Sequence, residues 1–360
     1  MRGLFQHLTP LAPDQSGAIA CLYELEGLVV ICDAGGCTGN ICGFDEPRWL
    51  RHKSAIFSAG LRDMDAILGR DAQLIAKIAQ IAADFKPKFV ALIGTPVPAV
   101  IATDFQGLTR LGEKKLGLPV LSVHTCGTKL YDTGMNQAYL ALAHKFLQKE
   151  QKPAKTNLEI HLLGATPLDL GLIDPCPLIK AYAVKYAQPK YAQVYAQGFG
   201  SGFATFCSLK DSQENIVLSP GALDLAIYCK TTFGTPYRFD YPLSLLGPYW
   251  PKILENLENK RNILIVHQQV LGASLRNHIE KTYANTQVIV GTFFNQCQEL
   301  TRPQDPHFTD EASFASYIQH QSFDLIIADE ILKRVPTTSQ LWLDLPHFAM
   351  SGRLLDLSTI

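Results

Sequence analysis

The sequence has no strong excess of charge of either sign and no long hydrophobic run. Its 360 residues carry 32 lysines and arginines against 33 aspartates and glutamates, which leaves a net charge of -1. This balance provides no broad electrostatic field for nucleic acid or anionic lipid. No segment reaches about 18 uninterrupted apolar residues, and no apolar core followed by a cleavage site stands near the start. We therefore expect a cytoplasmic protein that binds neither nucleic acid nor membrane.

The sequence also lacks the cysteine pattern of a small secreted protein. Its nine cysteines are an odd number and are spread over most of the chain. Disulfide frameworks pair even numbers of cysteines in short chains, so these thiols are expected to be free or to bind metal. Four of the nine lie between Cys21 and Cys42, and this clustering is the first sign of a specific site.

What the sequence does contain is an alternation of short apolar runs with amphipathic segments. Apolar runs rich in β-branched residues predict strands buried on both faces, at 27–33, 88–94, 119–124, 158–164, 192–198, 215–219, 262–267, 286–291 and 323–329. Amphipathic patterns predict helices at 71–85, 135–149, 220–233, 269–281 and 310–320. The expected fold class is α/β, with mostly parallel sheets in repeated Rossmann-like units.

Two polar stretches divide this alternation into three parts. The segments 147–157 and 254–262 combine charged residues with turn formers just before a new strand. We expect three Rossmann-like domains, at 1–155, 156–258 and 259–360. Ligands of open parallel sheets bind beyond the carboxyl ends of the strands, so the glycine-rich turns that follow the strands are the candidate sites.

The turn after the first predicted strand carries the most informative residues. Cys37 and Cys42 follow a buried run there. The glycines beside them are Gly35, Gly36 and Gly39. Glycines let an inorganic cluster approach the backbone, and cysteine thiolates are the usual ligands of iron–sulfur clusters. Free cysteine also serves as a small buried hydrophobe, and this is the expectation for Cys21 and Cys32, which lie in apolar runs.

The order of segments around this turn resembles the nitrogenase component 1 family. The segments that carry the resemblance are VVICDAGGCTGNICGF, FSAGLRDMDAILGRDAQL, KFVALIGTPVPAVIATDFQGL and PVLSVHTCGTKLYDTG. In that family a glycine-cysteine loop precedes an acidic segment, a strand ending in a Cys-Pro turn, and a strand leading into a glycine-rich loop. The later segments NIVLSPGALDLAIYCKTTFG and KRNILIVHQQVLGASLRNHIEK resemble its second and third domains. The resemblance implies a three-domain α/β fold and an iron–sulfur cluster.

Departures from the family pattern change the expected ligand set. Thr95 stands where the family has a cluster cysteine before the turn proline, and Pro13 and Asp14 stand where an N-terminal ligand cysteine is expected. Cys37 is in its expected place, Cys42 is an additional thiol, and Asp14 is a substitute ligand to be tested. If an identical or paralogous subunit also supplies two thiolates, four hold one 4Fe–4S cluster between the subunits.

Four further residues are candidates for proton transfer or substrate contact. His124 and Cys126 end one predicted strand and enter a glycine-containing loop. His347 lies in a C-terminal segment that the resemblance brings back toward the cavity, and His267 ends another predicted strand. A packed or hydrogen-bonded structural role is the competing interpretation for each of them.

Two other segments also allow two interpretations each. The run from Gly198 to Gly202 is a weak candidate for a phosphate-binding loop, since it lacks the spacing of the known motifs. Asp45, Glu46, Arg48 and Trp49 follow the cysteine loop and form either an interface with a partner or an electron-delivering reductase, or an exposed, salt-bridged turn.

The resemblance implies an oxidoreductase subunit. In this hypothesis an ATP-dependent iron protein delivers electrons to a cluster held by Cys37 and Cys42, and the electrons then reach a small-molecule substrate in the interdomain cleft. A second hypothesis is a non-catalytic scaffold or carrier on which a metal cluster or metallocofactor is assembled. A third is an α/β binding protein that has kept the fold and lost the cluster. The sequence does not identify the substrate.

Overall fold

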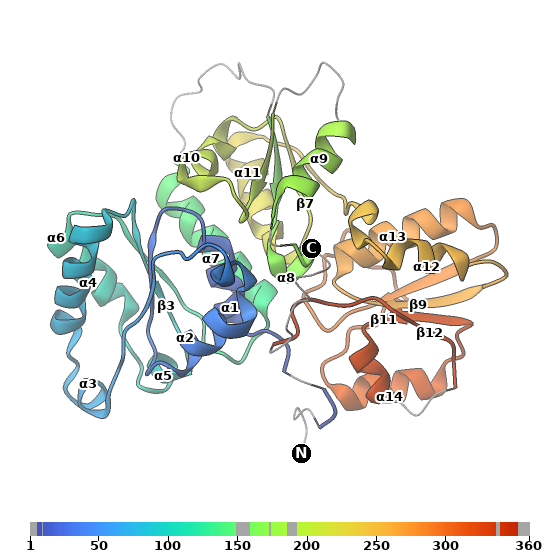
Figure 1. Cartoon of the computed structure of the whole chain (residues 1–360), viewed down its shortest axis with the longest axis horizontal. Coiled ribbons are helices and arrows are strands. Elements are labelled where there is room, and N and C mark those ends of the chain that lie inside the picture. Colours follow the sequence, from blue (N-terminus) through green and yellow to red (C-terminus); the bar gives the residue numbers. More distant parts are fainter. Residues whose placement is uncertain are drawn as a thin grey trace.

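Three separate parallel sheets of four strands each, flanked by helices, make up the fold (Figure 1). The computed structural model describes residues 6–8, 10–148, 159–172, 174–185, 193–335 and 339–351. The strand orders are β2-β1-β3-β4, β6-β5-β7-β8 and β10-β9-β11-β12, which are three copies of one topology. The predicted α/β class with parallel sheets is confirmed.

The strands follow the apolar runs of the sequence. They are β1 (Leu28–Ile31), β2 (Ile56–Ser58), β3 (Val90–Ile93), β4 (Val120–Val123), β5 (Glu159–Leu163), β6 (Gln193–Gln197), β7 (Glu214–Val217), β8 (Tyr237–Phe239), β9 (Asn262–Val266), β10 (Gln287–Gly291), β11 (Leu325–Ala328) and β12 (Trp342–Asp344). The apolar runs do not predict β2, β8 and β12. Each of these has three residues, lies at a sheet edge and is only partly buried, so it lacks a long apolar run.

The helices cover the faces of the sheets. They are α1 (Asp14–Leu22), α2 (Gly36–Asn40), α3 (Asp63–Leu68), α4 (Asp71–Phe85), α5 (Pro96–Val100), α6 (Phe105–Leu116), α7 (Tyr131–Phe146), α8 (Pro167–Leu170), α9 (Cys176–Lys185), α10 (Gly202–Cys207), α11 (Leu223–Phe233), α12 (Tyr249–Glu255), α13 (Gln269–Thr282) and α14 (Glu311–His320). Helix α4 has the predicted bounds, whereas α7 begins earlier than predicted because its first turn is polar in sequence. Over the part of the chain that is described, every helix is too short or too polar to span a membrane.

The division into domains stays a proposal. Each of the three sheets takes its strands from one predicted domain. The boundary at 155/156 and most of the linker 147–157 lie outside the described residues, and the linker 254–262 lies between α12 and β9.

Helices α1 and α7 cross so closely that their backbones touch. A Cβ atom at Gly17 would lie 1.9 Å from the carbonyl oxygen of Tyr131, and one at Gly134 would lie 1.7 Å from that of Asp14. These glycines therefore permit the crossing. All residues of α1 are buried, so this short helix lies at the centre of the molecule and fixes the position of Asp14.

Candidate functional site

The cysteine loop is held at the carboxyl end of β1 by Asp33. The Asp33 carboxylate accepts hydrogen bonds from the backbone N–H of Thr38 at 2.8 Å and from the hydroxyl of Ser58 at 2.5 Å. Gly35 caps α2 with a φ of 116°, a conformation that favours glycine. The chain then continues into a π-helical turn, η1 (Ile41–Asp45), a feature often found at functional sites.

The outer side of this loop is open. Cys37 lies on α2 and Cys42 on the π-helical turn, and both are half-buried. A Cβ atom added at Gly35, Gly36 or Gly39 would meet nothing within 4 Å. The roles of these five residues in binding a cluster stay predictions, and the open space beside the glycines leaves room for a ligand to reach the backbone.

The surroundings of both thiols favour their neutral form. Burial raises the pKa of Cys37, and the negative charge of Asp33 adds to this effect. Burial also raises the pKa of Cys42, together with the charges of Glu46 and Asp33. Metal binding at these sulfurs would release protons. Within the described residues no group of three or more His, Cys, Asp or Glu is placed to hold a metal ion.

Asp14 and Thr95, which stand where the family has cluster cysteines, form hydrogen bonds with backbone groups. Asp14 is fully buried, and its carboxylate accepts hydrogen bonds from the N–H groups of Cys126 at 2.9 Å and Gly127 at 2.7 Å. The hydroxyl of Thr95 donates to the carbonyl of Cys32 at 2.8 Å. These bonds join the start of α1 and the turns after β1, β3 and β4. The contacts of Asp14 are those of a structural acceptor and give no support to its role as a substitute ligand.

His124 and Cys126 lie in the turn after β4, on the same sheet edge as the cysteine loop. The exposed ring of His124 lies 5.2 Å from that of Phe105, and its Nε2 is 3.1 Å from the hydroxyl of Ser122. The half-buried Cys126 has its Sγ 3.6 Å from the carboxylate of Asp14. These are contacts of structural residues, and catalytic roles for the two stay predictions.

His347 is packed at the junction of the three sheets. Its ring stacks on those of His267 and Phe294, with centroids 4.4 Å apart in both cases. Its Nδ1 accepts a hydrogen bond from the backbone N–H of Ala349 at 3.1 Å. The cavity beside these rings has a volume of about 20 Å³, roughly the space that one water needs. His347 therefore contacts protein groups and does not line an open cleft.

Two carboxyl groups are buried at this junction. The hydroxyl of Tyr131 donates to Asp169 at 2.7 Å, and the backbone N–H of Asn295 donates to Asp132 at 2.6 Å. Burial raises the pKa of Asp169 to about 7 and that of Asp132 to about 6, against the hydrogen bonds that lower both. Asp132 continues the glycine-containing loop of His124 and Cys126 and is a weaker sequence candidate, whereas Asp169 is not a candidate because it has no local signal.

The charged residues after the cysteine loop are buried, so the interpretation as an exposed turn is wrong for them, whereas an interface of this segment with a partner stays a prediction. The buried residues are Asp45, Glu46 and Arg48. The Arg48 guanidinium lies 2.6 Å from Glu46 and 3.2 Å from Glu24, and it donates at 2.8 Å to the carbonyls of Ala20 and Gly198. Arg48 thereby joins α1 and the cysteine segment to the turn after β6 of the second sheet.

Two backbone N–H groups at and next to the run 198–202 donate to carboxylates of the same chain, which gives no support to a phosphate-binding loop there. The backbone N–H of Gly200 donates to the carboxylate of Glu24 at 2.5 Å, and that of Phe203 donates to Glu26 at 3.3 Å. The protein's own carboxylates therefore occupy the donors that a phosphate would need.

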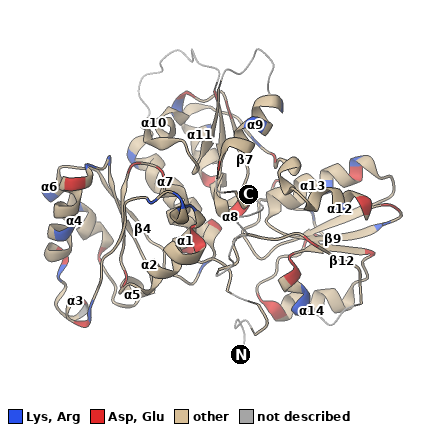
Figure 2. Cartoon of the chain, viewed as in Figure 1, with Lys and Arg blue, Asp and Glu red and all other residues tan. Residues whose placement is uncertain are grey.

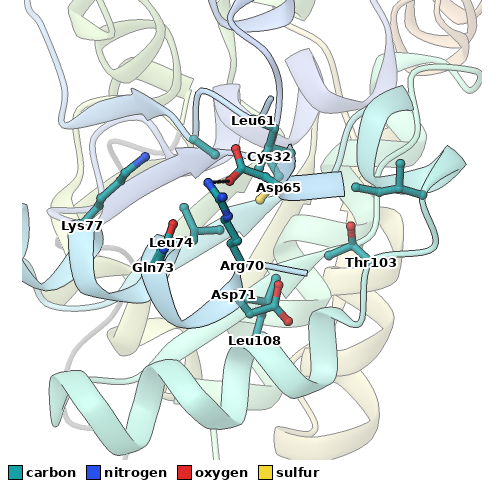
Figure 3. A pocket seen from close by; sticks show the side chains of 12 residues that line it. Cys32, Leu61, Asp65, Arg70, Asp71, Gln73, Leu74, Lys77, Thr103 and Leu108 are labelled. Carbon is teal, nitrogen blue, oxygen red and sulfur yellow. Dashed lines mark ion pairs between the residues drawn. The ribbon is translucent and has the colours of Figure 1, made fainter. Parts of the chain in front are cut away.

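A small cavity lies at the carboxyl edge of the first sheet, beside the first turn of α4 (Figure 3). Its volume is about 50 Å³, and Arg70 and Asp65 form an ion pair at 3.8 Å in its wall. Cys32 lines it as a thiol whose pKa burial raises to about 12. Cys21 is fully buried elsewhere in the core. The burial of both side chains agrees with the expectation that Cys21 and Cys32 are small hydrophobic residues of the core.

The fold and the cysteine loop define a class of three-sheet α/β proteins with a glycine-cysteine turn on the first sheet. The model of the family "Nitrogenase component 1 type Oxidoreductase" matches residues 15–247. The chain therefore belongs to the nitrogenase component 1 type oxidoreductase family, as its sequence resemblance predicts.

The individual relatives and solved structures share low sequence identity with this chain. The chain is 28% identical over 185 residues to the nitrogenase iron-molybdenum cofactor biosynthesis protein NifE of Clostridium pasteurianum, covering 50% of this chain and 38% of that protein. The structure described as nitrogenase Cp1 at pH 5 has a TM-score of 0.66 at 14% identity, over 98% of this chain and 86% of the other. The structure of nitrogenase Cp1 at pH 6.5 has a TM-score of 0.67 at 11% identity, over 97% and 90%. At these identities the two structures establish the fold alone.

Proposed function

We propose that this protein is an oxidoreductase subunit that holds a 4Fe–4S cluster at a subunit interface through Cys37 and Cys42. In this proposal an ATP-dependent iron protein supplies the electrons, and a small molecule is the substrate. The observation that carries the proposal is the position of two half-buried thiols on an open, glycine-lined turn at the carboxyl edge of the first sheet. Membership of the family supports the oxidoreductase class.

The residues present fit a cluster that is shared between two subunits. Cys37 and Cys42 of each subunit would bind through their sulfurs, which gives the four thiolates that a 4Fe–4S cluster needs. Asp33 orients the loop through its hydrogen bonds to Thr38. Gly35, Gly36 and Gly39 carry no side chain, so a cluster can approach the backbone of the loop closely. When bound, the group supplies one-electron transfer.

The same sheet edge carries the surface expected of an interface. Exposed apolar side chains in the segments after β1, β2 and β3 are Phe44, Met64, Ile67, Leu68 and Val100. Exposed apolar patches on soluble proteins mark interaction sites. Figure 2 shows acidic and basic residues distributed over the parts of the chain around all three sheets, in keeping with the balanced charge. We propose a second copy or a paralogous nitrogenase-like subunit as the partner at this edge.

A second candidate function is a scaffold or carrier for assembly of a metal cluster or metallocofactor. Similarity to the relative from Clostridium pasteurianum, whose name refers to cofactor biosynthesis, favours this scaffold function. So does the junction cavity of about 20 Å³, which does not admit an organic substrate in this conformation. Reduction of substrate over many turnovers with an iron protein and ATP supports the enzyme, whereas single-equivalent transfer of a cluster to an acceptor protein supports the scaffold.

The first experiment is anaerobic purification followed by iron and sulfide analysis and by EPR after dithionite reduction. We expect about four iron atoms per dimer, because four thiolates hold one cluster. Cys37→Ala and Cys42→Ala should each lose the iron and the EPR signal. Cys176→Ala, which removes an exposed thiol on α9, is the matched control and should keep both. Wild-type protein that stays free of iron after reconstitution with iron and sulfide would overturn the proposal.

A further inference from the structure

A polar groove with a volume of about 370 Å³ lies between the second and third sheets. Its walls come from α9, from the turn after β8 with the 3-10 helix η5 (Leu243–Leu246), and from α13. Helix α9 connects β5 to β6 of the second sheet, and α13 connects β9 to β10 of the third (Figure 1). The 3-10 helix η5 packs against both helices. Small-molecule sites of this size are often found between domains and at the carboxyl ends of strands. An occupant of this groove would contact elements of both sheets.

Several polar side chains of the groove have hydrogen-bond donors or acceptors that the described part of the chain does not use. Ser244 and Asn277 make no side-chain hydrogen bond to any other part of the chain that the structure describes. The Ser274 hydroxyl accepts a hydrogen bond from the N–H of Tyr241 at 3.1 Å, which leaves its own hydrogen free to donate. His278 lies one helical turn from Ser274 on α13 and also lines the groove.

The accessible charged group of the groove is a donor. The ammonium group of Lys185 lies 2.6 Å from the carboxylate of Asp240, and the Lys185 side chain is 50% exposed. An ammonium group has three N–H donors, so two remain after this ion pair. Asp240 is the one carboxylate among the described residues that line the groove, and its side chain is only 17% exposed, so a ligand reaches the ammonium more readily than the carboxylate. A ligand that contacts Lys185 must supply acceptors, and an anion makes the strongest hydrogen bonds to an ammonium group.

One wall of the groove is apolar. The side chains that form it are Ala181, Phe239, Pro242 and Leu243. An inorganic ion would leave this surface exposed to water, whereas a carbon skeleton would cover it. The volume also exceeds that of a single phosphate or carboxylate group by far.

We propose that this groove binds a small organic anion. Its phosphate or carboxylate group accepts hydrogen bonds from Lys185 and from the polar side chains of α13, and its carbon skeleton packs on the apolar wall. The inference goes beyond the proposed function and does not depend on the cluster, because no residue of the groove belongs to the cysteine loop.

Isothermal titration of the full chain with ribose 5-phosphate, with gluconate and with neutral ribose tests the proposal. We expect at least one of the two anions to bind with a Kd below about 1 mM and ribose to show no binding at the same concentrations. The anion that binds more tightly identifies the head group as phosphate or carboxylate. Equal titration curves for both anions and for ribose would overturn the proposal.

Substitutions on the two walls locate the binding. Lys185→Met keeps the apolar stem and removes the charge, and it should weaken binding about tenfold. Asn277→Ala, on the opposite wall, should weaken it about threefold. Lys180→Met is the matched control, because Lys180 is an exposed lysine of α9 outside the groove. Thermal unfolding confirms that each variant is folded. Equal affinities for Lys185→Met and Lys180→Met would contradict the assignment even if an anion binds.

Discussion

Two carboxyl groups at the junction of the three sheets are kept from water. Asp132 and Asp169 are each 1% exposed. Burial raises their pKa values to about 6 and about 7, because the ionised form loses its hydration in these surroundings. The folded protein therefore keeps protons that the unfolded chain releases. This couples the stability of the junction to pH.

The sign of this coupling gives a prediction for Asp169. Between its ordinary pKa of 3.8 and its folded value of about 7, only the folded form is protonated, so stability is present at low pH and is lost as pH rises through this window. The loss is about 4 kcal/mol by the linkage relation. Asp169→Asn stays neutral, so its free energy of unfolding in urea should fall much less between about pH 5 and pH 8 than that of wild type. An unchanged pH dependence in this variant would contradict the shifted pKa.

The helix crossing of α1 and α7 shows how single glycines determine an element's position. The first turn of α7 lies against the first turn of α1, where the carboxylate of Asp14 accepts N–H groups of the turn after β4. Any side chain at the crossing would push α1 away from this turn. Because the cysteine loop and α1 lie at the same sheet edge, the crossing also fixes the position of α1 relative to the candidate site.

We predict that Gly134→Ala is strongly destabilising. The added Cβ would lie 1.7 Å from the carbonyl oxygen of Asp14, which the backbone cannot accommodate without moving one helix. The free energy of unfolding should fall by about 3 kcal/mol or more. Gly36→Ala is the control, since its Cβ meets nothing within 4 Å, and it should change stability by less than about 0.5 kcal/mol. Urea unfolding of both variants measures the difference, and equal midpoints would argue against a tight crossing.

At the scale of the whole molecule, the three described sheets have the same strand topology. The carboxyl edges of these sheets differ in their surroundings. In the second and third sheets, residues after the strands meet at the central junction, where Asp169, His267 and His347 are buried. In the first sheet, the turns after β1 and β3 carry exposed apolar side chains and half-buried thiols. The first sheet therefore provides the surface on which the proposed subunit interface depends.

A matched pair of valines tests this interface. Val100, at the end of α5 on the proposed interface, is 84% exposed, and Val184 on α9 is 79% exposed. Val100→Asp would bury a charge between subunits and should weaken dimerisation at least about tenfold in sedimentation velocity, with loss of iron. Val184→Asp should behave as wild type. Equal dimer affinities in the two variants would place the interface elsewhere.

The sequence by itself determined the buried strands, the parallel α/β class, the family and the cysteine loop. These follow from local signals, because burial on both faces requires a continuous apolar run and a tight turn requires glycine. The central strands of the three sheets are all visible in this way, whereas the edge strands β2, β8 and β12 depend on pairing with a distant neighbour.

Only the tertiary structure decided which polar groups are buried. Glu46 and Arg48 read as an exposed turn, but the structure buries them because Glu24 and the carbonyls of Ala20 and Gly198 complete their hydrogen bonds. Asp14 similarly accepts N–H groups more than a hundred residues away in sequence. Whether a charge can be buried depends on partners that the fold brings together, and no local pattern records those partners.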